Sequence, residues 1–220
     1  PETVLAYGLI DCFGLISGPF IGHLEPTEKP ADARLRAAMN CCVPQMSVII
    51  PRAQLEHLGG YDEDLTTAED FDLFARLAFR GPFIGADERT AEYRQHDEQA
   101  TRRVGGQVSA DSVRVRARCL SLVREQLGAE AHETARRHAL ASWRRSTREA
   151  WLSGDEETLD RLLAVSRLVL GSSAAATAWR VRRLLLWQPW RAILWLGRRV
   201  KRTSFWTAGI DRRWRKWRVS

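Results

Sequence analysis

The sequence predicts an α/β layer, followed by an all-α helical extension and a basic tail. Over residues 1–104, short apolar runs of strand type alternate with helix-type segments, as in α/β folds. From about residue 108 to residue 170, apolar residues recur at every third or fourth position, which is typical of packed helices. We therefore divide the chain into three parts, 1–104, 105–177 and 178–220.

Each element of the first part has its own local signal. The predicted strands are Thr3–Tyr7, Ser47–Ile50, Phe83–Ala86 and Thr90–Arg94, the last two as a hairpin-like pair; the predicted helices are Ala31–Met39, Ala53–Leu58 and Glu69–Phe79. Gly59-Gly60 ends the second helix, because glycine readily adopts the left-handed conformation of a C-cap. Gly81-Pro82 is the stop signal after the third helix.

The helical part is expected to contain three antiparallel helices. An apolar pattern runs through Val113, Ala117 and Leu120, and it continues in two later stretches. Glycine breaks this pattern at Gly128 and at Ser153-Gly154, and short breaks between helices favour antiparallel neighbours.

The net charge of +7 is distributed unevenly along the 220 residues. Residues 178–220 hold 13 Lys or Arg residues, one acid and seven of the nine Trp residues, whereas the other 177 residues hold 21 basic and 26 acidic residues. Arginine interspersed with Trp and Leu is typical of a helix at an anionic membrane surface. Packing on the body and binding of single-stranded nucleic acid are the alternatives, but no nucleic-acid-binding motif is present.

Composition also limits where the protein works. No uncharged run reaches the roughly 20 apolar residues of a membrane span. The four cysteines form no CxxC pair, which favours buried free thiols in a reducing cytoplasm over a disulfide or zinc framework. We expect a cytoplasmic protein that can lie peripherally on the inner face of the membrane. The chain begins with proline, and its first residues show no signal-peptide pattern. We therefore expect that this chain is the C-terminal part of a longer protein.

The segment from Ser47 to His96 carries the most specific motifs. Gly59-Gly60-Tyr61-Asp62-Glu63 is followed by Glu69-Asp70-Phe71-Asp72-Leu73 and then by Tyr93-Arg94 with His96. In this order and spacing, the motifs resemble the second half of the catalytic domain of family-2 glycosyltransferases, which have the GT-A fold. The residues from Pro1 to Gly14 also resemble the stretch just after the Asp-x-Asp metal motif of that family.

The resemblance implies a partial, Rossmann-like GT-A domain that lacks its nucleotide-binding half and is inactive alone. It implies transfer of a sugar from a nucleotide-diphosphate donor to a glycan, lipid or small-molecule acceptor, with inversion. The family's divalent metal, Mn²⁺ or Mg²⁺, would be held mostly by residues upstream of this chain. The QxxRW motif of processive synthases is absent, since Gln99 is followed by Arg102-Arg103, and this favours single additions over polymerisation.

The expected catalytic residues are Glu69 and Asp70, with Asp70 as the general base. A carboxylate in the first turn of a helix is kept ionised by the helix dipole. Asp70 has Phe74 and Leu77 at i+4 and i+7, so we place it on the inward, apolar side. Asp72 has Arg76 at i+4, and we expect an exposed ion pair between them. The alternative is structural, because Thr67-x-x-Asp70 before an apolar run is also a capping-box pattern.

Other site residues follow from the resemblance. It implies that His96 completes the metal site and that Arg94 faces the diphosphate, although a loop histidine and a surface salt bridge are the structural alternatives. It also implies that Gly59, Gly60, Tyr61 and Asp62 border the acceptor pocket, whereas a helix end explains the two glycines equally well. A different class of function stays open, namely a non-enzymatic helical module that docks on a membrane through its basic tail.

Overall fold

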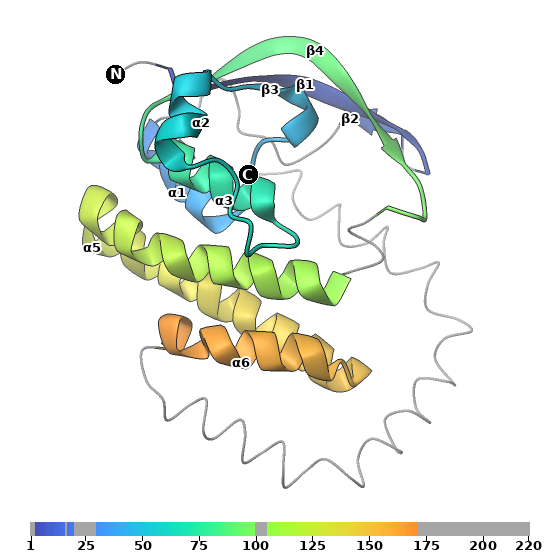
Figure 1. The fold of residues 1–220 in the computed structure, drawn as a ribbon, viewed down its shortest axis with the longest axis vertical. Coiled ribbons are helices and arrows are strands. Elements are labelled where there is room, and N and C mark those ends of the chain that lie inside the picture. The colour runs from blue at the N-terminus through green and yellow to red at the C-terminus, as the bar shows by residue number, and fades with distance from the viewer. Residues whose placement is uncertain (1–2, 16, 20–29, 100–104, 171–220) are drawn as a thin grey trace, which may run out of the picture. The chain divides into compact units, whose positions relative to one another are not determined.

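The structure is a computed structural model that describes residues 3–15, 17–19, 30–99 and 105–170 (Figure 1). Contacts divide the chain into two units, Pro1–Gly171 and Ser172–Ser220, and all described residues belong to the first. The predicted basic tail, 178–220, lies outside the described residues. No described helix combines the length and the apolar character that crossing a membrane requires.

A small mixed sheet is built around β1 (Leu5–Gly14). The long strand β4 (Phe83–Gln95) runs parallel to β1 along its whole length. Two short strands pair with β1 in the antiparallel sense, β3 (Val48–Ile49) near its start and β2 (Gly18–Pro19) near its end. The prediction of an α/β layer is confirmed, with a longer first strand than the sequence indicated.

The predicted hairpin between Phe83–Ala86 and Thr90–Arg94 is wrong, because both runs belong to the single strand β4. The register passes from Gly8 opposite Ala86 to Leu9 opposite Arg89, so the residues between Ala86 and Arg89 form an irregularity instead of a turn. Asp87 and Glu88 are both extra there, and a second shift follows between Leu9 and Ile10. Extra residues that are absorbed as bulges bend a strand without reversing it. Parallel pairing with β1 therefore keeps the two runs in one strand, although the local composition between them is typical of a turn.

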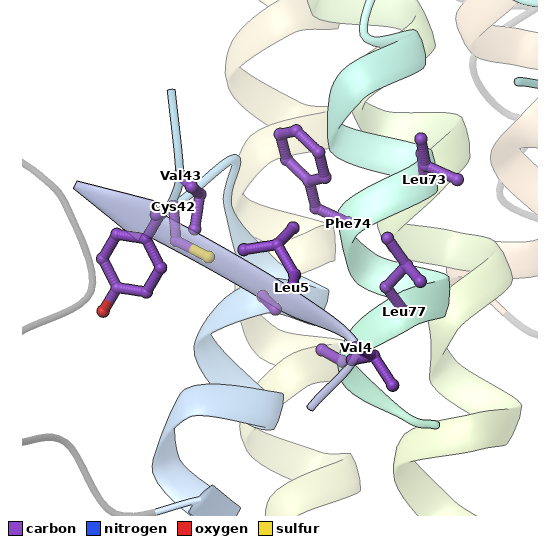
Figure 2. Close-up of a cluster of buried hydrophobic side chains, with 10 residues drawn as sticks. Val4, Leu5, Cys42, Val43, Leu73, Phe74 and Leu77 are labelled. Carbon is purple, nitrogen blue, oxygen red and sulfur yellow. The ribbon is translucent and has the colours of Figure 1, made fainter. Parts of the chain in front are cut away.

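The helix α3 (Glu69–Ala78) lies between two hydrophobic clusters. Leu73, Phe74 and Leu77 pack with Val4 and Leu5 of the sheet region and with Cys42 and Val43, as Figure 2 shows. On its other side, α3 packs through Phe71, Ala75 and Phe79 against the helical part. Full burial of a Leu or Phe side chain contributes roughly 1.5–3 kcal/mol, so α3 is fixed from both sides.

Two further helices flank α3. The helix α1 (Pro30–Met39) contributes Ala37 to the sheet-side cluster and Ala38 to the other one. The helix α2 (Arg52–Leu58) ends at Gly59, which is left-handed with φ 74° and ψ 17°, as predicted for this C-cap. The amide of Gly60 then donates to the Leu55 carbonyl at 2.9 Å. A 3₁₀ turn, η1 (Gln45–Ser47), precedes β3.

The helical part contains three helices, as predicted. The long element α5 (Gly105–Ser153) is broken at Gly128, whose φ of 87° and ψ of −176° are not helical, and α6 (Glu156–Leu170) follows the turn at Gly154. Arg116 of the first arm of α5 contacts Ser142 of the second arm. Trp143 donates to the Leu162 carbonyl at 2.8 Å. Each contact joins residues on opposite sides of a break and at comparable distances from it, so consecutive helices run antiparallel.

Candidate functional site

The first turn of α3 carries the two predicted catalytic carboxylates. Its N-cap, Ala68, is left-handed with φ 59° and ψ 23°, and no side chain caps the helix there. The Thr67 hydroxyl donates instead to Asp111 of α5 at 2.7 Å. The capping-box alternative is therefore wrong, because a tertiary partner takes the hydroxyl that the local pattern assigned to the helix.

Asp70 is half-buried in this turn and carries no ion pair within the described ranges. One carboxylate oxygen, Oδ1, accepts the backbone amide of Phe71 at 2.7 Å. The other, Oδ2, lies 3.5 Å from the Sγ atom of Cys41, the donor of a thiol hydrogen bond. Asp70 is thus oriented by an amide and a thiol, and no described residue supplies a cationic partner for its charge.

Cys41 differs from the other cysteines, since Cys12, Cys42 and Cys119 are buried as predicted but Cys41 is exposed. Burial and the Asp70 carboxylate both raise the pKa of the Cys41 thiol. Because the Cys41 side chain is exposed to solvent, the geometry supports the Asp70 carboxylate beside Sγ as the main cause of the raised pKa. A thiol with a raised pKa stays protonated at neutral pH and can keep donating to Asp70.

The pair of Asp72 and Arg76 is present, but the expectation that it is exposed is wrong. Asp72 Oδ2 lies 2.7 Å from Arg76 Nε, and the Asp72 side chain is only 7 % exposed. Arg76 also donates to the carbonyls of Leu58 and Gly60, at 3.0 and 2.9 Å. Asp72 is therefore more deeply buried than Asp70, because α3 is covered on both sides and has no solvent-facing stripe. The pair holds the Gly-Gly loop onto α3.

The Gly-Gly loop lines a hollow of about 490 Å³ between α3 and the first arm of α5. All four residues predicted to border the acceptor line it, and so do the buried ion pair and three residues of α5; the lining consists of Leu58, Gly59, Gly60, Tyr61, Asp62, Glu63, Asp72, Arg76, Arg118, Cys119 and Leu122. We call this hollow the Gly-Gly pocket. The structure thus brings these predicted substrate residues together, with a wall from the helical part.

Four of the five charged side chains that line the Gly-Gly pocket form ion pairs with one another, and Glu63 is the fifth. Arg118 forms an ion pair with Asp62, and this hydrogen-bonded guanidinium lowers the pKa of the Asp62 carboxyl. Gln45 donates from Nε2 to the Tyr61 hydroxyl at 2.9 Å. Sequence reasoning missed Arg118, Cys119 and Leu122, because a packed helix gives no local sign that one of its faces borders a pocket.

The remaining predicted residues lie elsewhere. Glu69, Asp70, Arg94 and His96 are not among the residues that line the Gly-Gly pocket. Arg94 and His96 are both exposed, Arg94 near the end of β4 and His96 just after it, and the Arg94 carbonyl accepts Gln99 Nε2 at 3.1 Å. Within the described ranges, no three His, Cys, Asp or Glu side chains gather as they would around a metal ion. The role of His96 as a metal ligand stays a prediction.

Residues 38–129 match the model of a family described as glycosyltransferase like family 2. The match begins at the end of α1 and includes the Gly-Gly loop, all of α3 and β4, and the first arm of α5. It thus extends beyond the α/β layer into the helical part. Neither the curated proteins nor the solved structures yielded a match to this chain.

Proposed function

We propose that the chain belongs to an inverting glycosyltransferase that uses nucleotide sugars, because residues 38–129 match the model of glycosyltransferase like family 2. The enzyme moves one sugar from a nucleotide-diphosphate donor to a glycan, lipid or small-molecule acceptor. The observation that carries this proposal is the state of Asp70, a half-buried carboxylate in the first turn of α3 that has no cationic partner among the described residues.

Asp70 is proposed as the general base of a single in-line displacement. Its carboxylate takes the proton of the acceptor hydroxyl while that oxygen attacks the anomeric carbon. The bond from the anomeric carbon to the phosphate oxygen breaks on the opposite side, and the nucleoside diphosphate leaves. One displacement of this kind inverts the anomeric configuration. The α3 dipole favours the ionised carboxylate before the proton arrives, and Cys41 orients it through Oδ2.

The Gly-Gly pocket is proposed to bind part of the acceptor away from its reacting hydroxyl, since Asp70 does not line it. Asp62 is paired with Arg118 and Asp72 with Arg76, and Glu63 adds one further negative charge to the lining. Such a lining offers hydroxyl groups both donors and acceptors, with one negative charge in excess. Tyr61, which is 44 % exposed, adds an aromatic surface.

The proposal for the sugar donor is supported by the family match alone. Arg94 at the end of β4 is exposed and is proposed to face the diphosphate, because a guanidinium matches phosphate oxygens. A divalent metal remains a prediction. The described residues form no cluster of three metal ligands. The GT-A fold is likewise a proposal, which the mixed sheet and the position of α3 beneath it support.

The alternative of a separate helical module finds less support. Val115, Val123 and Ala135 of α5 share one hydrophobic cluster with Phe71 and Ala75 of α3. The helical part therefore packs as an extension of the α/β layer, and it lends a wall to the Gly-Gly pocket. Association with a membrane through residues 178–220 stays a prediction from composition, because this segment lies outside the described residues.

The test compares Asp70→Asn with Asp72→Asn in the protein at its full natural length. Release of nucleoside diphosphate is measured with a panel of nucleotide sugars and acceptors, at a temperature where both variants are folded. We expect Asp70→Asn to lower turnover by about 10²–10⁴-fold and to leave donor binding nearly unchanged. Asp72→Asn alters the lining of the Gly-Gly pocket, so it should raise the KM for the acceptor while turnover at saturating acceptor is largely kept. An active Asp70→Asn variant would show that another group is the base.

A further inference from the structure

Arg116 of α5 is fixed at a junction of three helices. Its Nε donates to the Met39 carbonyl at the end of α1 at 2.6 Å, and its Nη1 donates to Ser142 Oγ at 3.3 Å. The guanidinium carbon lies 5.2 Å from the centre of the Phe71 ring of α3, within the range of a cation–π contact. The third nitrogen, Nη2, makes no hydrogen bond with any residue in the described part of the chain.

Two more basic side chains share the helix face that meets Arg116. His138, Ser142 and Arg145 are spaced i, i+4 and i+7 on the second arm of α5, so they lie along one face. The contact from Arg116 to Ser142 shows that this face is turned toward Arg116. His138 Nδ1 is buried and has no hydrogen-bond partner among the described residues, whereas Arg145 is exposed.

These basic groups have no compensating acid in the part of the chain that the structure describes. No carboxylate oxygen of a described residue lies within ion-pair distance of Arg116, His138 or Arg145. Burial and the charge of Arg145 lower the pKa of Arg116 to about 10. Burial, followed by the charges of Arg116 and Arg145, lowers the pKa of His138. Both shifts have the direction expected for positive charges that repel one another in a partly buried site.

We propose that Arg116, His138, Ser142 and Arg145 form a binding site for a phosphate group, entered from the exposed end at Arg145. The phosphate oxygens would accept hydrogen bonds from Nη2 of Arg116 and from the guanidinium of Arg145. Guanidinium groups match phosphate oxygens in geometry. Its negative charge would relieve the repulsion among the basic groups. This site is separate from the Gly-Gly pocket, and it does not depend on a catalytic role for Asp70.

The proposed phosphate site is linked to Asp70 through a short segment of the chain. Arg116 is bonded to the Met39 carbonyl, and two residues later Cys41 contacts Asp70. A ligand here would therefore be connected through one short segment to the proposed base. A nucleoside diphosphate and the headgroup of a phospholipid carry the same phosphate chemistry, so the experiment includes both.

The experiment measures binding to the full chain by isothermal titration in chloride buffer. The probes are inorganic phosphate, a nucleoside diphosphate and a short-chain phosphatidic acid below its micellar concentration. Arg145→Gln is compared with Arg144→Gln, an exposed arginine one position away that lies off the face of His138 and Ser142. We expect saturable phosphate binding that Arg145→Gln weakens about tenfold, the loss of roughly one charged hydrogen bond, and that Arg144→Gln leaves unchanged.

A second variant keeps the test decisive. His138→Gln should also weaken phosphate binding, while its thermal unfolding shows whether the helices remain intact. The basic residues of 178–220 can attract phosphate without a specific site, but such binding would be indifferent to Arg145 and His138. Absence of saturable binding, or equal affinity in Arg145→Gln, Arg144→Gln and the unchanged chain, would overturn the proposal. Tighter binding of the diphosphate or of the phospholipid identifies the source.

Discussion

The Thr67 hydroxyl donates a 2.7 Å hydrogen bond to the Asp111 carboxylate, which joins the start of α3 to α5 across 44 residues of sequence. Asp111 is only 4 % exposed. Thr66 contacts the same carboxylate oxygen at 3.5 Å. The turn that presents Glu69 and Asp70 is therefore held in place by the helical part and not by a cap of its own.

Asp111→Ala should destabilise the protein and loosen this turn. Removal of the carboxylate leaves the Thr67 hydroxyl without its partner, which costs roughly 1–3 kcal/mol of unfolding free energy. Chemical denaturation measures the loss, and hydrogen exchange of the Phe71 amide reports on the turn. Glu125→Ala is the matched control, because Glu125 is an exposed acid on the same helix and should change stability by less than about 0.5 kcal/mol. Equal losses in the two variants would contradict the structural role of Asp111.

Asp72→Asn should affect stability far more than Asp70→Asn does. The neutral amide leaves the Arg76 guanidinium without its buried carboxylate, and a lost hydrogen bond between charged groups costs roughly 1.5–3 kcal/mol. Asp70→Asn keeps an acceptor for the Phe71 amide and should stay within about 0.5 kcal/mol. The midpoints of denaturant unfolding compare the two variants directly. A larger loss for Asp70→Asn would mean that Asp70 is the structural aspartate.

Asp70→Asn should make Cys41 react faster with iodoacetamide. The carboxylate raises the pKa of the thiol, so its removal lowers that pKa and increases the thiolate fraction at a given pH. Since the thiolate is the nucleophile, we expect the alkylation rate at mildly alkaline pH to rise about threefold to tenfold. Mass spectrometry follows Cys41, while the other three cysteines are buried.

Glu69→Gln is the control for this measurement. It removes a neighbouring carboxylate that has no part in raising the Cys41 pKa, so the alkylation rate should not change. If both variants accelerated the reaction equally, the effect would come from the general field of the turn and not from the contact between Sγ and Oδ2.

The sequence by itself determined the local elements whose signals are self-contained. Gly59 ends α2 because its left-handed conformation is easiest for glycine. Gly128 and Gly154 mark the ends of helices in the same way. The motif around Glu69-Asp70, read with the Gly-Gly loop, indicated the family to which residues 38–129 were then matched. These features depend on residues close together in the chain.

Only the tertiary structure decided features that join distant residues. Phe83–Gln95 became one strand because β1 offers a parallel partner along its whole length. Asp72 became buried because α3 is packed on one side by the sheet and on the other by α5. Helical periodicity identifies an apolar stripe, but it cannot show that a second layer covers the opposite face. For the same reason, the wall that Arg118 adds to the Gly-Gly pocket, and the group of Arg116, His138 and Arg145, were visible only after folding.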